Sequence, residues 1–138
     1  MQFAETDLAG MVHFSNFFRY MEEAEHALWR AAGMRIDSPS LASSGEASPH
    51  AHLKWPRVSA AFDFKRPLRF EDEFEVLVGI AAVTTRSIQY NHTIMRGEIT
   101  VGIGTVTAAC VQLGADHVLR AVEIPPEILS RLRGVVGT

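Results

Sequence analysis

Residues 3–33, FAETDLAGMVHFSNFFRYMEEAEHALWRAAG, decide the fold that we predict for this chain. The stretch starts with a polar turn containing Asp7 and continues as a helical pattern. Apolar side chains recur at three- and four-residue spacing, which is typical of a helix with one apolar face. They are Phe17, Tyr20, Met21, Ala24, Ala27, Leu28 and Ala31. Ser15 or Asn16 is suited to cap the start, and Gly33 to close the end in a left-handed conformation. The pattern therefore predicts one long helix of about 25 Å.

The start of this helix is where we expect the chemistry. Free N–H groups and a partial positive charge at a helix N-terminus stabilise an oxyanion. Asp7 precedes that end on a turn that Gly10 allows to fold tightly, so a carboxylate and an oxyanion site would face one gap. On spacing alone an Asx-turn role for Asp7 is favoured over a role as base or nucleophile, and both stay open. His13 could tune Asp7, donate to a substrate or simply pack.

The rest of the chain predicts strands. Residues 34–54 are rich in Ser, Ala and Pro and form either a cover over a pocket or a surface loop. Thereafter the apolar period is two, with Val58, Ala60, Phe62 and Phe64 on one buried face of the first strand. The predicted strands span residues 58–64, 74–80, 87–95, 99–113 and 119–124. A short helix follows from Pro126 to about Arg133. In the long strand 99–113, Gly102 and Gly104 are expected to mark bends or bulges.

These elements predict an α+β fold in a single domain, residues 1–138. The connections between strands are short, so they allow antiparallel hairpins and leave no room for crossover helices. One long helix and a run of antiparallel strands have only each other to cover their apolar faces. We therefore expect a curved antiparallel sheet wrapped around one long central helix.

The composition limits the classes of function. The 138 residues are 47% hydrophobic, which is enough for one core. A net charge of −3 gives no basic field for nucleic acid, and no run of eighteen apolar residues is present to cross a membrane. The single Cys110 fits a reducing compartment and a buried strand position. We expect a cytoplasmic protein that binds neither nucleic acid nor membranes.

Several cofactor and hydrolase motifs are missing from the sequence. There is no G-x-S-x-G elbow, phosphate-binding loop or dinucleotide-binding glycine pattern, and the six histidines lack metal-ligand spacing. No metal and no other cofactor is expected. Lys65, Arg66 and Arg86 lie at predicted strand ends, where basic side chains form a solvated rim or contact phosphate, and position alone favours the rim.

The stretch leading into the helix resembles the active-site signature of a known family. The motif is FAETDLAGMVHFSNF at residues 3–17, followed by RYMEEA at residues 19–24. It resembles that of hotdog-fold acyl-CoA thioesterases and is most similar to the 4-hydroxybenzoyl-CoA thioesterase branch. The pattern of that branch is D-x-D-x-x-G-x-V, then two aromatic or His positions, a variable residue and Asn. The first acidic position is Glu5 here, and His13-Phe14 stands where many bacterial members have Tyr-His.

The resemblance implies an enzyme that hydrolyses an acyl-CoA thioester to a free carboxylic acid and CoA. The catalytic Asp of the family falls on Asp7, as nucleophile or general base. The backbone N–H that polarises the thioester carbonyl falls on Phe14, and Gly10 shapes the turn. The histidine role of the family does not carry over to His13, which completes the expected catalytic group from its place between Gly10 and the helix start. Residues expected to bind the substrate are Asn16, Phe17 and Glu23.

The resemblance also implies partners. The CoA nucleotide would lie near Arg86 and Ser87, with Lys65 and Arg66 as further contacts. Two subunits of this family join their sheets, so we expect a homodimer or a dimer of dimers with the active sites at the interface. One alternative is a hotdog protein that binds acyl-CoA without catalysis. Another is a thioesterase that acts on acyl-carrier protein or on 1,4-dihydroxy-2-naphthoyl-CoA.

Overall fold

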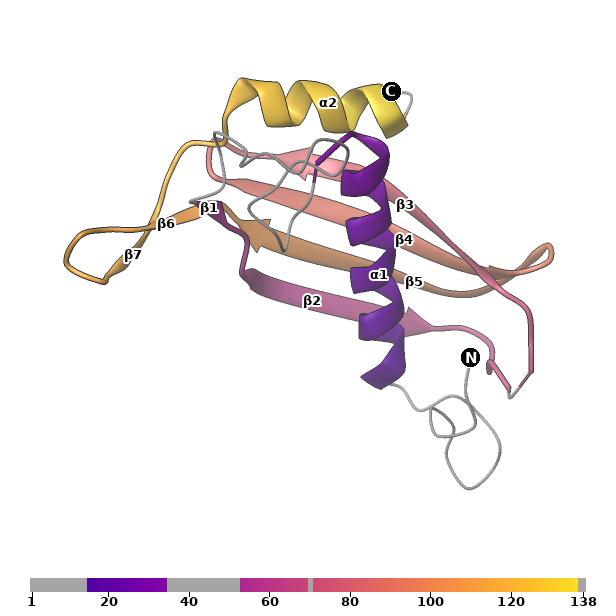
Figure 1. The fold of residues 1–138 in the computed structure, drawn as a ribbon. Helices are drawn as coiled ribbons and strands as arrows, with labels where there is room; N and C mark the ends of the chain where they lie inside the picture. The colour runs from indigo at the N-terminus through magenta and orange to yellow at the C-terminus, as the bar shows by residue number, and fades with distance from the viewer. Residues whose placement is uncertain (1–14, 35–52, 70, 137–138) are drawn as a thin grey trace.

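The computed structural model describes residues 15–34, 53–69 and 71–136. Its elements in chain order are α1 (Ser15–Ala31), β1 (Leu53–Lys54), β2 (Arg57–Phe64), β3 (Glu75–Val83), β4 (Ser87–Arg96), β5 (Ile99–Ala109), β6 (Val111–Leu113), β7 (Leu119–Ala121) and α2 (Pro126–Val136). Each strand pair that these residues form is antiparallel. Figure 1 shows α1 crossing one face of the larger sheet, with α2 near its C-terminal end. The predicted α+β class is confirmed, although two helices lie against the sheet.

The strands of the described residues form two sheets. The larger has the order β2-β5-β4-β3, and the smaller has the order β1-β6-β7. The predicted strand over residues 99–113 is divided at Cys110, so β5 belongs to one sheet and β6 to the other. The expected bulge lies at Val101, the extra residue where Ile94 pairs with Gly102 but Met95 pairs with Thr100. Gly102 and Gly104 themselves pair regularly. The bulge therefore lies one residue before Gly102 and three residues before Gly104, and its predicted place was wrong by these amounts.

The helix α1 begins and ends where its sequence predicts. It starts at Ser15, and Gly33 beyond its end has a positive φ of 80°. The N–H of Gly33 donates to the carbonyl of Arg30 at 3.0 Å, and the N–H of Met34 donates to that of Trp29 at 2.9 Å. These two bonds make a Schellman motif, which satisfies carbonyls that the helix itself leaves free.

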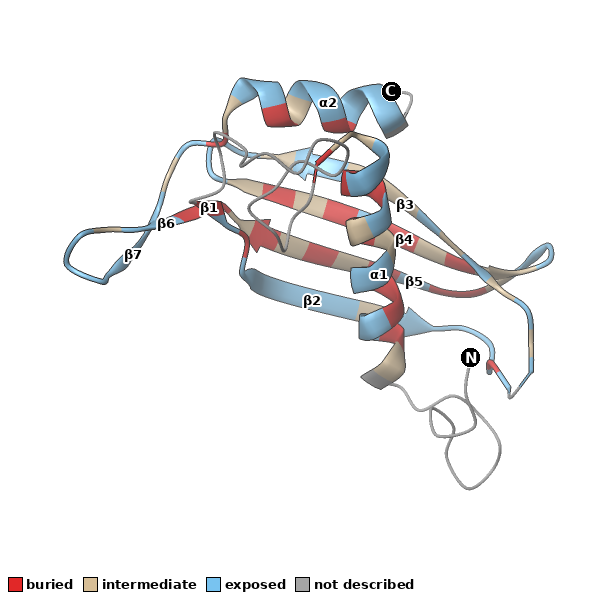
Figure 2. Cartoon of the chain, viewed as in Figure 1, coloured by how far each residue is buried: buried red, intermediate tan, exposed pale blue. Residues whose placement is uncertain are grey.

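The buried face of α1 differs from the predicted stripe. Figure 2 shows the buried positions of both helices facing the sheet. Ala27 and Ala31 are exposed, whereas Glu25 and Trp29 are buried. A tryptophan removes far more apolar surface from water than an alanine does, which favours the rotation that buries Trp29. The charged Glu25 then lies inside the interface between α1 and the sheet.

The strand β2 is less buried than its alternating pattern predicts. Within the described residues it is an edge strand, paired only with β5. Val58 is 62% exposed, Phe64 is 52% exposed and Ala60 is exposed too, so the prediction of one buried face was wrong for these three positions. Val58 is the extra residue of a bulge between Arg57 and Ser59. An open edge of this kind is a surface on which another strand can pair.

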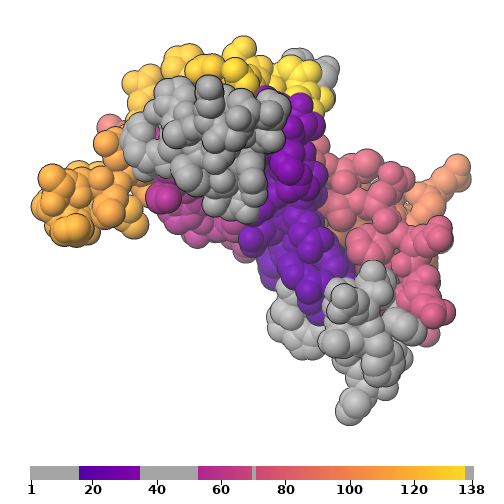
Figure 3. Space-filling model, in the orientation of Figure 1, coloured from indigo at the N-terminus to yellow at the C-terminus, as the bar shows by residue number. Residues whose placement is uncertain are grey.

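The β6–β7 hairpin projects from the rest of the molecule (Figure 3). Leu113 and Leu119 pair across it, and their side chains are 49% and 55% exposed. At its tip Arg120 donates to both carboxylate oxygens of Asp116, at 2.6 and 3.1 Å, and this hydrogen bonding lowers the pKa of the Asp116 carboxyl. Among the described residues no helix has both the length and the apolar character needed to cross a membrane.

Candidate active site

Four residues of the predicted catalytic group, Asp7, Gly10, His13 and Phe14, lie outside the described residues. Their arrangement therefore stays a prediction. The described part of the site starts at Ser15, the first residue of α1. The first four N–H groups of an α-helix have no acceptor within the helix, so the predicted site would use N–H donors of this turn.

Aromatic rings from α1 and β2 form an apolar wall beside the first turn of α1. Phe17 is 2% exposed, and its ring centroid lies 4.9 Å from that of Phe62 and 5.1 Å from that of Phe64. Phe62 and Phe64 are 4.7 Å apart and meet edge to face. We call Phe17, Phe62 and Phe64 the aromatic wall. Its half-exposed member, Phe64, leaves an apolar surface open beside the first turn of α1.

Two glycines of β5 allow Phe62 to lie flat on the sheet. Gly104 and Gly102 pair with Phe62 and Phe64 across the strands. A Cβ at Gly102 would lie 2.2 Å from Cζ of Phe62, and a Cβ at Gly104 would lie 2.8 Å from Cδ2 of the same ring. No side chain larger than hydrogen fits under the ring at either position. The Gly102-Ile103-Gly104 sequence thus serves the packing of the aromatic wall.

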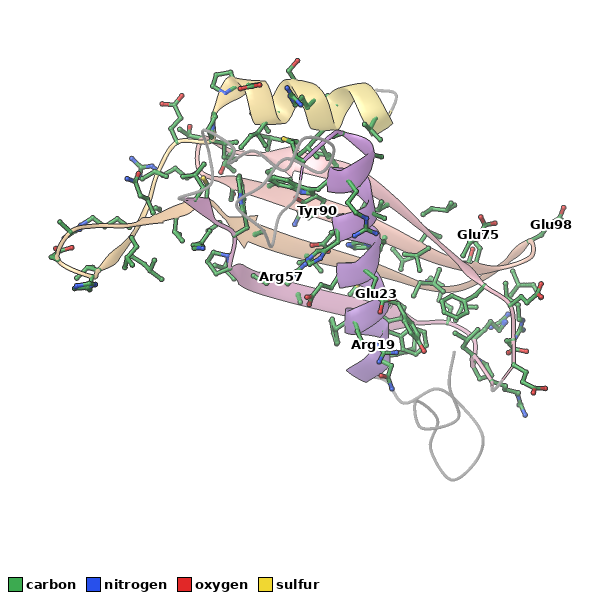
Figure 4. All side chains as sticks on the ribbon, in the orientation of Figure 1. Arg19, Glu23, Arg57, Glu75, Tyr90 and Glu98 are labelled. Carbon is green, nitrogen blue, oxygen red and sulfur yellow. The ribbon has the colours of Figure 1, made fainter. Side chains whose placement is uncertain are left out.

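The predicted substrate-binding residues occupy different faces of α1. Phe17 faces the sheet, and Asn16 is partly buried in the first turn. Glu23 is on the exposed face, where its carboxylate lies 3.8 Å from the guanidinium of Arg19 (Figure 4). Asn16 and Phe17 are therefore brought to the helix start, while Glu23 points away from the sheet.

The predicted CoA-binding residues fall into two groups at opposite ends of the larger sheet. Lys65 and Arg66 follow β2, and their N–H groups donate to the carbonyl of Val101 at 2.8 and 3.0 Å. Arg86 and Ser87 lie in the turn before β4, where the Ser87 hydroxyl is 2.6 Å from that of Thr84. Both basic groups are exposed. The fold of a single chain does not bring them together.

A buried polar cluster that the sequence did not predict lies between α1 and the sheet. Nη2 of Arg57 donates to Oε1 of Glu25 at 2.7 Å, and Nε2 of His92 lies 2.8 Å from Oε2 of Glu25. Glu25 and His92 are both 0% exposed. Figure 4 shows Arg57 reaching from β2 toward α1. The available signal was the spacing of Glu25, four residues after Met21 and three before Leu28, which places it on the apolar stripe.

Burial affects two further groups near this cluster. The indole N–H of Trp29 donates to the hydroxyl of Tyr90 at 2.9 Å, and burial raises the pKa of that phenol far above its ordinary value. Burial also raises the pKa of the Cys110 thiol to about 11. Such a thiol is a poor nucleophile at neutral pH. Within the described part of the chain, no three His, Cys, Asp or Glu side chains gather as metal ligands would.

Comparisons with known proteins identify the family. The profile of the Thioesterase-like superfamily matches residues 1–132. The chain belongs to this superfamily. Membership places the protein among thioester hydrolases, and solved structures with the hotdog thioesterase fold resemble it. The resemblance found in the sequence is thus confirmed at the level of the family.

Three relatives illustrate the similarity. A protein of Aquifex aeolicus for which esterase activity is proposed is 29% identical over 133 residues, covering 96% of this chain and 93% of the relative. A 1,4-dihydroxy-2-naphthoyl-CoA hydrolase of Thermosynechococcus vestitus is 30% identical over 115 residues, covering 82% and 73%. The crystal structure of a hypothetical protein from Aquifex aeolicus has a TM-score of 0.80 at 28% identity, covering 96% and 94%.

Proposed function

We propose that this thioesterase hydrolyses an acyl-CoA to a free carboxylic acid and CoA. The observation that carries the proposal is the aromatic wall beside the first turn of α1. An apolar surface next to the N-terminal turn of a helix suits an acyl chain whose carbonyl oxygen must be polarised. The motif containing Asp7 leads directly into this turn. In this proposal α1 is the central helix around which the sheet curves.

The proposed chemistry needs one carboxylate and one N–H group. The N–H of Phe14 would hold the thioester oxygen as negative charge develops, which for one well-placed donor contributes roughly 3–4 kcal/mol. Asp7 would attack the carbonyl carbon, so that the C–S bond breaks and a mixed anhydride forms for water to hydrolyse. Alternatively it would take a proton from the attacking water. Gly10 would shape the turn, and His13 would tune Asp7 or donate to the substrate.

We further propose a homodimer formed along the open edge of β2, with a dimer of dimers as the larger assembly. The Arg57 end of β2 lies in register with the start of β4, and its Phe64 end lies in register with the end of β4. Antiparallel pairing of two β2 strands would therefore set Arg86 of the partner subunit near Lys65 and Arg66. Separate basic groups would then surround one CoA.

Thiol release from acyl-CoAs tests the catalytic proposal. The assay uses aromatic, short, medium and long acyl-CoAs with the native protein, Asp7→Ala and Asp7→Asn. We expect turnover to vanish in both variants while far-UV circular dichroism and CoA binding are unchanged. Asp116→Asn is the control, since it removes an exposed carboxylate at the hairpin tip. Near-native turnover by Asp7→Asn would reject Asp7 as the catalytic carboxylate.

The CoA contact has its own kinetic signature. Arg86→Ala should raise KM for an acyl-CoA and leave kcat unchanged, because a phosphate contact acts equally on the ground state and the transition state. Arg133→Ala, another exposed arginine, is the control. A fall in kcat with an unchanged KM would place Arg86 outside CoA binding.

A second candidate substrate is 1,4-dihydroxy-2-naphthoyl-CoA. The named activity of the Thermosynechococcus vestitus relative favours including it, and flat aromatic groups stack well against phenylalanine rings. Binding of acyl-CoA without thiol release would instead support a binding protein. Release only from an acyl-carrier protein would support the carrier-protein alternative.

A further inference from the structure

Glu25 connects three elements of the fold from a fully buried position. Its two carboxylate oxygens bond to Arg57 on β2 at 2.7 Å and to His92 on β4 at 2.8 Å. The rest of the buried stripe of α1 is formed by apolar and aromatic side chains, of which Trp29 donates one hydrogen bond to Tyr90 on β4. Glu25 is therefore the point at which α1 makes charged, directional contacts with two strands at once.

Stability alone does not account for this cluster. Removing charged groups from water is costly, and well-packed apolar residues of similar size are often at least as stabilising as a buried ion pair. Here Nδ1 of His92 is also buried without a hydrogen-bond partner among the described residues. A buried polar atom without a partner lowers stability. Features that lower stability in this way are expected where function requires them.

The backbone of β2 is arranged to bring Arg57 to Glu25. Ser59, Ala61 and Asp63 pair with outward-facing positions of β5, and unbroken alternation would place Arg57 on the same outer face. The bulge at Val58 instead aligns Arg57 with Ala108, a buried residue of the inner face. Bulges often re-aim a side chain in this manner. The same bulge leaves Val58 62% exposed.

Directional bonds control a movement that apolar packing does not. Apolar contacts are non-directional, so they tolerate a small slide of α1 along its axis. Bonds from one carboxylate to two strands would be broken by that slide. Glu25 is ten residues after Ser15, or about 15 Å along the helix. Because a helix is a rigid rod over this length, its first turn moves with Glu25.

We infer that Glu25 is a positioning residue, which Arg57 and His92 hold in place so that the first turn of α1 stands at a fixed height beside the aromatic wall. The inference rests on the proposed function, because the first turn is where the thioester carbonyl would be polarised. The cluster acts on the reaction through the position of the helix and does not touch the substrate.

Two variants test the inference. The apolar triple variant Glu25→Met/Arg57→Met/His92→Leu removes every charge of the cluster and keeps its volume. We expect it to fold with a Tm no lower than native, and its kcat to fall about 10- to 100-fold with little change in KM, as misplacement by about 1 Å does. Glu25→Gln keeps the shape of the side chain and part of its hydrogen bonding, so its kcat should lie between those of the native protein and the triple variant. Arg30→Met, on the exposed face of α1, is the control.

The position of α1 has a readout that does not depend on activity. Trp29, one turn after Glu25, meets Trp55 edge to face at 5.1 Å and bonds to Tyr90. A slide of α1 should therefore change the near-ultraviolet circular dichroism of the triple variant. If this change occurs but the native protein releases no thiol from any thioester, the proposed function is rejected. The inference that Glu25 fixes the position of α1 is then still supported.

Other outcomes overturn the inference. A folded triple variant with native kcat and a native near-ultraviolet spectrum would show that the position of α1 does not depend on Glu25, Arg57 and His92. If the triple variant fails to fold, the test rests on Glu25→Gln. A native kcat together with a native near-ultraviolet spectrum in Glu25→Gln would also overturn the inference.

Discussion

Gly102→Ala should destabilise the protein, because the ring of Phe62 occupies the space above Gly102. A Cβ there would lie 2.2 Å from Cζ and 2.3 Å from Cε1 of Phe62, and 2.9 Å from the carbonyl oxygen of Asp63. Carbon atoms in contact are ordinarily about 3.5–4.0 Å apart, so the ring must move by about 1.5 Å. The backbone oxygen prevents the strand from simply absorbing the methyl group.

The loss of stability in Gly102→Ala can be estimated from the aromatic contacts that the ring of Phe62 loses by moving. Phe62 packs on Phe17 and Phe64 at centroid distances of 4.9 and 4.7 Å. Each aromatic pair contributes about 0.5–1.5 kcal/mol, so losing both costs about 1–3 kcal/mol. Alanine recovers about 0.5–1 kcal/mol, because glycine weakens a strand interior by that amount. The difference between these two terms is a fall of about 0–2.5 kcal/mol in the free energy of unfolding.

Urea unfolding of Gly102→Ala, Phe62→Ala and the double variant measures this coupling. In the Phe62→Ala background the space is open, so Gly102→Ala should cost nothing or stabilise slightly. Gly134→Ala in α2 is the control, since a Cβ there meets no heavy atom within 4 Å. It should stabilise the helix by about 0.5–1 kcal/mol. An equal cost of Gly102→Ala in both backgrounds would refute the proposed clash with Phe62.

Three further predictions concern the helix and the core. Trp29→Phe leaves the hydroxyl of Tyr90 without its buried donor and should lower the free energy of unfolding by about 1–3 kcal/mol in guanidinium titrations, whereas a native midpoint would mean that the hydroxyl finds another partner. Gly33→Ala must adopt a φ of 80° and should lower that free energy by about 1 kcal/mol; no loss would argue against the Schellman motif. Burial raises the pKa of the Cys110 thiol from 9.0 to about 11, so its stabilising effect is full below pH 9 and declines as the pH rises toward 11. Thermal melts between about pH 8 and pH 10 should therefore show a smaller loss in Cys110→Ala than in the native protein, and parallel losses would contradict this.

Much of the fold could be predicted because side-chain periods report burial directly. The spacing of apolar residues from Phe17 to Leu28 predicts α1, and alternation in residues 74–80 and 87–95 predicts β3 and β4. The family was also predictable, from the motif at residues 3–17. The break at Cys110 was not, because β5 and β6 form one apolar run although they pair in different sheets.

The candidate site was predicted less completely. Glu25 was missed because a carboxylate ordinarily indicates an exposed helix face, and its partners Arg57 and His92 are distant in sequence. The exposure of Phe64 was missed because alternation does not distinguish an edge strand from a central one. For Asp7 and Phe14 the sequence remains the source of the assignment.

Two of the three bulges in the described part of the larger sheet explain how α1 acquires a defined place on it. At each of these bulges the extra residue shifts the alternation of side chains, so a residue that alternation places on the outer face lies on the inner face instead. The bulge at Val101 adds a buried valine to the cluster that includes Phe17 and Tyr20, below the first turns of α1. The bulge at Val58 turns Arg57 inward to Glu25, below the middle of the helix. Both contacts occur at bulges. One bulge supplies apolar packing under the start of α1, and the other supplies the ion pair under its middle.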